Sequence, residues 1–169
     1  MITMHSVSVP VFARMLKNSR TWLDKLVAHA ELKKFEPSVL LNARLAPDQF
    51  AFMRQLQIAT DGAKGCSARL AGIDIPRYED TETTIDELKA RLDKTVAFIE
   101  GIDAARFEGS DAREIVLPSP RGDRRFVGED YLRFHAMPNF YFHVTTAYAI
   151  LRHNGVDIGK GDYLAGALK

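Results

Sequence analysis

A single apolar stripe near the C-terminal end of the chain limits the possible folds more than any other feature of the sequence. Five hydrophobic residues recur there at alternating steps of three and four: Met137, Phe140, Val144, Ala147 and Leu151. Such steps keep side chains on one face of an α-helix, whereas a half-buried strand would alternate by two. Asn154-Gly155 follows directly and is a typical helix stop. The run therefore predicts a long helix with one buried face.

Two earlier segments repeat this helical spacing. Ser8-Val9-Pro10 supplies a serine N-cap and an early proline, which predict a helix reaching about Ala30. A second helix is predicted from Pro47-Asp48 to Gly72, because its apolar residues step by four and three as in bundle helices. The lone cysteine, Cys66, lies within that apolar stripe. We therefore expect Cys66 to be a packing residue and not a nucleophile.

A third helix is predicted to begin at Thr84. Thr84 and Glu87 have the spacing of a capping box, in which each side chain satisfies a free amide of the first turn. The charged face of this helix includes Glu87 and Arg91, and we expect it to be solvated, as most exposed charge pairs are.

The helical pattern breaks over residues 105–130. Two short apolar runs flank Pro118-Ser119-Pro120-Arg121-Gly122-Asp123, which predicts a short hairpin or an extended lid. Helical spacing then resumes near residue 129 and contains Pro138. Because proline removes one helical hydrogen bond and crowds the preceding turn, we expect a kink just before Pro138. The tail from residue 156 onward is expected to be rich in turns.

Four long amphipathic segments with little strand pattern predict an all-α, four-helix bundle that forms one domain over residues 1–169. The connections between the segments are long for a simple bundle. One of them can therefore cross the length of the bundle, so the spacing alone permits both an up-down-down-up and an up-down-up-down course.

The charge balance narrows the expected partners. The chain has 23 Lys and Arg against 22 Asp and Glu, a net charge of +1. The chain has almost no excess of positive charge with which to bind a phosphate backbone, so we expect no nucleic acid partner. The first residues lack the pattern of a signal peptide, and no apolar run approaches the ~20 residues of a membrane span. We expect a soluble, cytoplasmic protein that does not contact a membrane.

Three stretches of the sequence resemble an uncharacterised bacterial family of the DinB-like superfamily. They are QIATDGAK (57–64), PNFYFHVTTAY (138–148) and LRHNGVDIGK (151–160), and the resemblance extends over nearly the whole chain. It implies an up-down-down-up four-helix bundle that is commonly dimeric. In better-known relatives the bundle holds a divalent metal on three histidines, one from the second helix and an H-x-x-x-H pair from the fourth.

Carried onto this sequence, the resemblance leaves one of the three histidines. His143 matches the second histidine of the pair, the position four residues earlier is Asn139, and the second-helix position falls at or near Gln57. Three imidazoles can form a catalytic zinc site, whereas two amide oxygens and one imidazole form a weak site at best. We therefore expect no cofactor, with a divalent metal (zinc, nickel or manganese) bound by these three residues as the alternative.

The residues themselves favour a structural role for His143. Asn139 and His143 are four apart, so they share a stripe beside the apolar face of the fourth helix. We expect a neutral interior histidine hydrogen-bonded to Gln57 or Asn139, because buried polar groups need partners. Asp61, one turn after Gln57, and His135, two turns before His143, are the remaining candidate pocket residues. An exposed aspartate is the simpler expectation for Asp61.

Two functions are compatible with these observations. The first is a non-catalytic bundle with a vestigial metal site that acts as a small-ligand-binding or interaction homodimer. The alternative is a metal-dependent hydrolase or thiol transferase that uses an altered Gln/Asn/His site. The dimer is also expected because the fourth helix carries more large apolar residues than one buried face uses. These residues are Phe134, Phe140, Tyr141, Phe142, Val144 and Tyr148. The alternative to a dimer is that the segment at residues 105–130 covers them.

Overall fold

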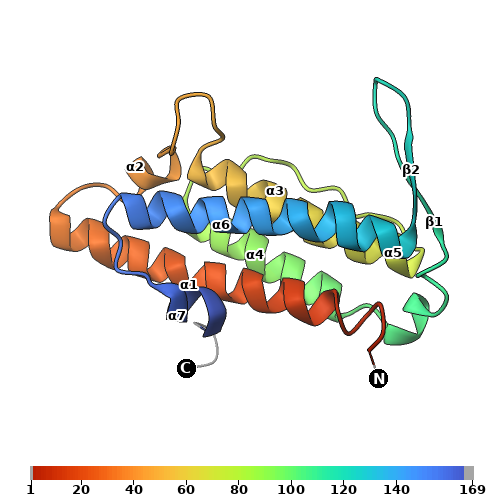
Figure 1. Cartoon of the computed structure of the whole chain (residues 1–169). Coiled ribbons are helices and arrows are strands. Elements are labelled where there is room, and N and C mark those ends of the chain that lie inside the picture. The colour runs from red at the N-terminus through yellow and green to blue at the C-terminus, as the bar shows by residue number, and fades with distance from the viewer. Residues whose placement is uncertain (1, 166–169) are drawn as a thin grey trace.

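Four long helices lie side by side and form most of the molecule (Figure 1). The computed structural model describes residues 2–165. The long helices are α1 (Val9–Lys33), α3 (Phe52–Ala71), α4 (Ile85–Glu100) and α6 (Met137–His153). The shorter elements are α2 (Ser38–Leu41), the 3₁₀ turn η1 (Ala104–Phe107), strands β1 (Glu114–Leu117) and β2 (Arg124–Val127), α5 (Gly128–Tyr131), the π-helical turn η2 (Leu132–Ala136) and α7 (Lys160–Ala165). The predicted, mostly helical class with one small hairpin is confirmed.

The core lies where the apolar stripes of the long helices meet. The stripe of α3 is fully buried along its length, through Phe52, Leu56, Ala59, Ala63, Cys66 and Leu70. On α6, Phe140 packs edge to face against Phe12 of α1, with ring centroids 4.8 Å apart. Burial raises the pKa of the Cys66 thiol, which keeps it protonated and suits the packing role predicted for it.

The helix ends follow local sequence signals with two exceptions. The capping box is confirmed: Thr84 Oγ1 accepts from the Glu87 amide at 3.2 Å, and the Glu87 carboxylate accepts from the Thr84 amide at 3.0 Å. In contrast, α3 begins at Phe52 and not at Pro47-Asp48, because the Phe52 amide donates to the Ala43 carbonyl across a loop. Ser8 is not a side-chain cap either, because its hydroxyl donates backward to the Met4 carbonyl at 2.6 Å.

The tail forms a short helix where only turns were expected. Helix α7 packs on α1, and Trp22 of α1 is fully buried beneath it. The Tyr163 ring stacks on Trp22 with a centroid distance of 5.8 Å, and Asn18 Nδ2 donates to the Tyr163 carbonyl at 2.7 Å. These contacts with α1 stabilise a helix that is too short to persist alone.

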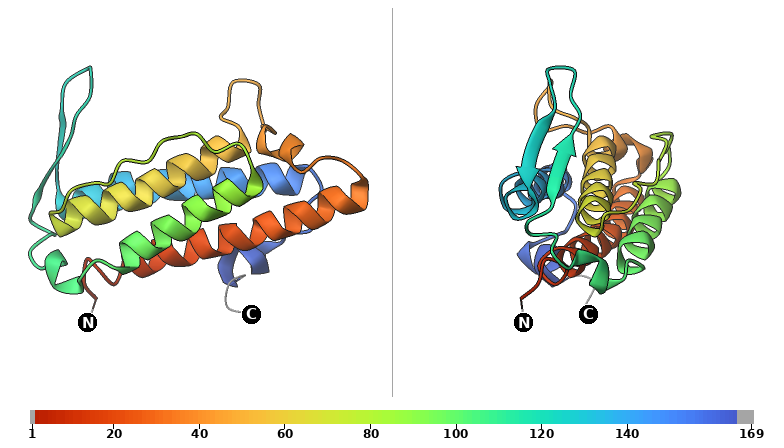
Figure 2. Two further views of the ribbon diagram at one scale, coloured as in Figure 1. Left: turned by 180° about the vertical axis from the view of Figure 1, so that it is seen from behind. Right: turned by 90° about the vertical axis from the view of Figure 1, so that its right-hand side faces the viewer.

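The entry to α6 carries the predicted irregularity. The π-helical turn η2 lies immediately before α6, with Pro138 in the first turn of that helix, where its missing amide is tolerated. The hairpin precedes this turn, with β1 and β2 antiparallel and Leu117 opposite Arg124. Figure 2 shows that the hairpin projects from one end of the helices.

Residues 73–84, here called the strap, connect α3 to α4 without regular structure. The strap returns along the length of α3 (Figure 2). It therefore covers part of the surface that α3 and α4 would otherwise expose. None of the helices in the described part of the chain combines the length and hydropathy needed to cross a membrane.

Candidate functional site

The candidate site is centred on His143, on the side of α6 that faces α3. His143 is 7% exposed, and its Nδ1 lies 2.7 Å from Oε1 of Gln55. The Gln55 amide is oriented by its own donation from Nε2 to the Phe50 carbonyl at 3.0 Å. Because an amide oxygen can only accept, Nδ1 of His143 carries the proton, and Nε2 is the basic nitrogen of the neutral ring.

The surroundings of His143 keep its ring neutral. Its pKa is lowered first by burial and second by the positive charge of Arg54. Nε2 has no hydrogen-bond partner among the described residues, and it is not one of their fully buried unpaired atoms. It can therefore accept a hydrogen bond from a ligand or from water.

The Gln57 side chain forms its hydrogen bonds with Arg54 and Glu82 and not with His143. Its Oε1 accepts from Arg54 Nη1 at 3.2 Å, and its Nε2 donates to Glu82 of the strap at 2.8 Å. The hydrogen bond predicted between His143 and Gln57 or Asn139 is thus replaced by the one to Gln55.

Asn139 lies against α3 close to Gly62. A Cβ placed on Gly62 would be 3.9 Å from Asn139 Nδ2. Gln55, Ala59 and Gly62 follow one another at steps of four and three, so one face of α3 meets both Asn139 and His143. This spacing was the sequence signal that could have identified Gln55 as the partner of His143.

Asp61 belongs to a second cluster, built around the guanidinium of Arg91. The Arg91 side chain is only 2% exposed, and its Nη2 lies 2.9 Å from Asp61 and 3.0 Å from Asp80. Its Nη1 lies 3.0 Å from Glu82, and its Nε donates to Thr60 Oγ1 at 2.7 Å. The expectation of a solvated Arg91 was wrong, because the strap folds over it.

The strap adds an aromatic contact to this cluster. The Tyr78 ring lies 3.7 Å from Lys64 Nζ and 4.2 Å from Lys94 Nζ, measured to the ring centroid. Lys64 also pairs with Asp61 at 3.0 Å. The strap is therefore attached to α3 and α4 by ion pairs and cation–π contacts.

His135 lies at the base of the hairpin. Its ring stacks on Phe126 of β2 at a centroid distance of 5.6 Å and lies 5.8 Å from the Tyr131 ring. Burial, followed by the charges of Arg124 and Arg69, lowers its pKa. The structure thus gives His135 partners in the hairpin and in α5, and not in the His143 site.

The donors around His143 do not fit a three-ligand metal centre. His143 offers one imidazole nitrogen, whereas the Gln57 oxygen already accepts from the Arg54 cation. The described residues contain no group of three His, Cys, Asp or Glu side chains placed to hold a metal ion. The arrangement is suited to hydrogen bonding at one neutral imidazole.

The helical architecture with its projecting hairpin is that of a DinB-like protein. A solved structure of a DinB family member protein from Shewanella denitrificans is similar, with a TM-score of 0.90 and 46% identity over 95% of this chain and 91% of that one. A family model described as a domain of unknown function (DUF1993) matches residues 4–164, so the chain belongs to the DUF1993 family. No curated protein matches it. The resemblance inferred from the sequence is confirmed.

Proposed function

We propose that this protein is a DinB-like bundle without a functional three-histidine metal centre, which acts as a small-ligand-binding or interaction homodimer. The observation that carries this proposal is the His143–Gln55 hydrogen bond, 2.7 Å long, which leaves Nε2 as an acceptor. The return of the strap along α3 supports an up-down-down-up course of the four long helices (Figure 2).

The His143 site favours a ligand that combines a hydrogen-bond donor with an apolar part. Nε2 supplies the acceptor, and the adjacent Phe142 ring, 55% exposed, lies edge-on to the imidazole with a centroid distance of 5.2 Å. Apolar and aromatic surface beside a few polar groups is one element of small-molecule sites.

The exposed aromatic residues of η2 and α6 support the homodimer. Phe134, Tyr141 and Phe142 are 68%, 38% and 55% exposed. Tyr141 and Phe142 follow Phe134 by seven and eight residues, so the three side chains lie on one side of the helix. Exposed apolar patches of this kind commonly mark interaction surfaces.

One observation favours the alternative, a metal-dependent hydrolase or thiol transferase. Metal-binding histidines commonly donate their second ring nitrogen to an oxygen acceptor, as His143 does to Gln55. The alternative requires Gln57 to leave Arg54 and Glu82 and to turn its oxygen toward His143. Zinc, nickel or manganese would be the ion.

Unfolding experiments test the proposal. Thermal and urea unfolding are measured, with and without EDTA, for three untagged proteins: wild type, His143→Ala and His143→Gln. His143→Ala should lower the free energy of unfolding by about 2–4 kcal/mol, because it opens a cavity and leaves the buried Gln55 oxygen without its donor. His143→Gln should have a distinctly smaller effect. His153→Ala, at an exposed histidine of the same helix, is the control.

EDTA should not change the stability of the wild type if the proposal is correct. A fall of several degrees in Tm on adding EDTA, absent from both His143 variants, would instead establish the metal site. Elemental analysis after incubation with zinc, nickel or manganese gives an independent result. Stoichiometric, chelator-resistant metal that disappears in His143→Ala would overturn the proposal.

A further inference from the structure

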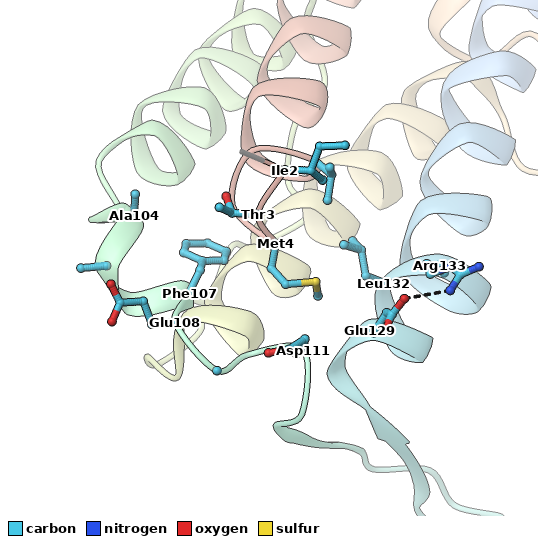
Figure 3. A pocket seen from close by; sticks show the side chains of 13 residues that line it. Ile2, Thr3, Met4, Ala104, Phe107, Glu108, Asp111, Glu129, Leu132 and Arg133 are labelled. Atoms are coloured by element: carbon cyan, nitrogen blue, oxygen red, sulfur yellow. Dashed lines mark hydrogen bonds and ion pairs between the residues drawn. The ribbon is translucent and has the colours of Figure 1, made fainter.

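A cavity of about 860 Å³ lies at one end of the bundle (Figure 3). Its walls come from the N-terminal segment at residues 2–7, the turn at residues 104–111, and the stretch from α5 into η2. The volume lies within the range of small-molecule sites, roughly 300–1,000 Å³. The cavity is separate from the His143 site, because Arg133 on its wall precedes His143 by ten residues, or roughly 15 Å of helix.

The inner wall of the cavity is apolar and firmly packed. Phe107 and Leu132 line it and are only 4% and 3% exposed, so both belong to the core. Met4 and Val7 complete this wall from the N-terminal segment. The Phe107 ring packs edge to face against the His5 ring, with a centroid distance of 5.1 Å. These side chains form a preformed surface for the apolar body of a ligand.

The rim of the cavity is acidic. It carries Glu108, Asp111 and Glu129, with Arg133 as the only basic lining residue in the described chain. Arg133 Nη1 is paired with Glu129 at 2.8 Å, as the dashed line in Figure 3 marks. Glu108 and Asp111 form no ion pair with any described residue. The rim therefore has a net negative charge, and its one cation is already neutralised.

We propose that this cavity binds a small amphipathic cation, namely a molecule with an aromatic or alkyl body and a protonated amine. The body would lie on Met4, Phe107 and Leu132, and the ammonium group would lie at the rim, attracted by the negative charges of Glu108 and Asp111. Among the described lining residues, an anionic ligand would meet two carboxylates that form no ion pair and no unpaired cation, so it is disfavoured.

Three probes share a phenylbutyl body and differ in the charge of the end group: 4-phenylbutylamine, 4-phenylbutanol and 4-phenylbutyrate. Comparing their affinities separates the contribution of the apolar body to binding from that of the charge. Isothermal titration of the full chain should give saturable 1:1 binding of the amine. The alcohol should bind roughly tenfold more weakly, and the butyrate more weakly still, because each loses attraction to the acidic rim. No saturable binding of the amine, or equal binding of all three probes, would overturn the proposal.

Substitutions of lining residues test whether the amine binds in this cavity. The double variant Glu108→Gln, Asp111→Asn should abolish the roughly tenfold preference for the amine over the alcohol, whereas Glu36→Gln, an exposed acid outside the cavity, should preserve it. Ala105→Trp, at an exposed lining position, should weaken binding of the amine and the alcohol by obstructing the cavity. Amine preference that survives the double variant, or binding unaffected by Ala105→Trp, would contradict the assignment. Thermal unfolding of each variant verifies that it is folded.

His143→Gln separates this site from the one proposed above. Because the two lie far apart along the helix, His143→Gln should leave the affinity for the amine unchanged. Loss of amine binding in that variant would place the ligand at His143 and overturn the assignment to the end cavity.

Discussion

Arg91 offers the sharpest test of how the strap is held, through the variant Arg91→Met. The guanidinium is 2% exposed and lies within 3.0 Å of carboxylate oxygens of Asp61, Asp80 and Glu82. Methionine keeps most of the length and apolar volume of the side chain. The variant therefore removes the charge and the donors while opening little space.

The expected loss of stability follows from the exposure of the three acids. Removing one partner of a fully buried ion pair typically costs about 3–5 kcal/mol, because the other charge is left without compensation. Here Asp61 and Asp80 are 39% and 35% exposed and can recover hydration, whereas Glu82 is only 14% exposed. We therefore expect Arg91→Met to lower the free energy of unfolding by about 2–4 kcal/mol, near the lower part of the range for buried pairs.

Urea unfolding measures this loss, and hydrogen exchange of the strap amides reports the local effect. Arg20→Met is the matched control, because Arg20 is 40% exposed and joins α1 to Asp93 of α4 at 2.9 Å. A surface pair of this kind should contribute less than about 1 kcal/mol. Adding Glu82→Gln to Arg91→Met should restore part of the lost stability. Equal losses in Arg91→Met and Arg20→Met, with unchanged exchange in the strap, would refute this account of the cluster.

Two further predictions concern α6. Light scattering at micromolar concentration should give a dimeric mass for the wild type and a smaller mass for Phe142→Ser. The control Leu32→Ser, at an exposed apolar residue of α1, should remain dimeric. A monomeric wild type would reject the dimer. The lowered pKa of His143 means that the unfolded chain binds its proton more readily, so stability should fall as the pH drops through about 6.5. Between pH 8 and 5 the free energy of unfolding should therefore fall more for wild type than for His143→Gln, so that the difference between the two proteins shrinks in that window. Parallel profiles would show that His143 does not contribute.

The sequence by itself was sufficient for the helical class, for the break in the helical pattern at residues 105–130 and for the irregular entry to α6. These features depend on local signals: the spacing of apolar residues, the capping box at Thr84 and the prolines around the turn. Local signals were misleading at Pro47-Asp48 and in the tail, where contacts between distant segments determine the structure. The Phe52 amide bonds to Ala43, and α7 is stabilised by Trp22.

Only the tertiary structure decided the partners of the polar residues. Gln55 and Gln57 are two residues apart on α3, yet one binds His143 of α6 and the other binds Glu82 of the strap. Successive helical residues point about 100° apart, so the rotation of α3 between its neighbours determines which amide meets the histidine. That rotation results from packing over the whole core. Arg91 has the spacing of a solvated helix face, and it is buried only because the strap returns across it. The strap has no regular structure, so no periodicity in the sequence predicts its path.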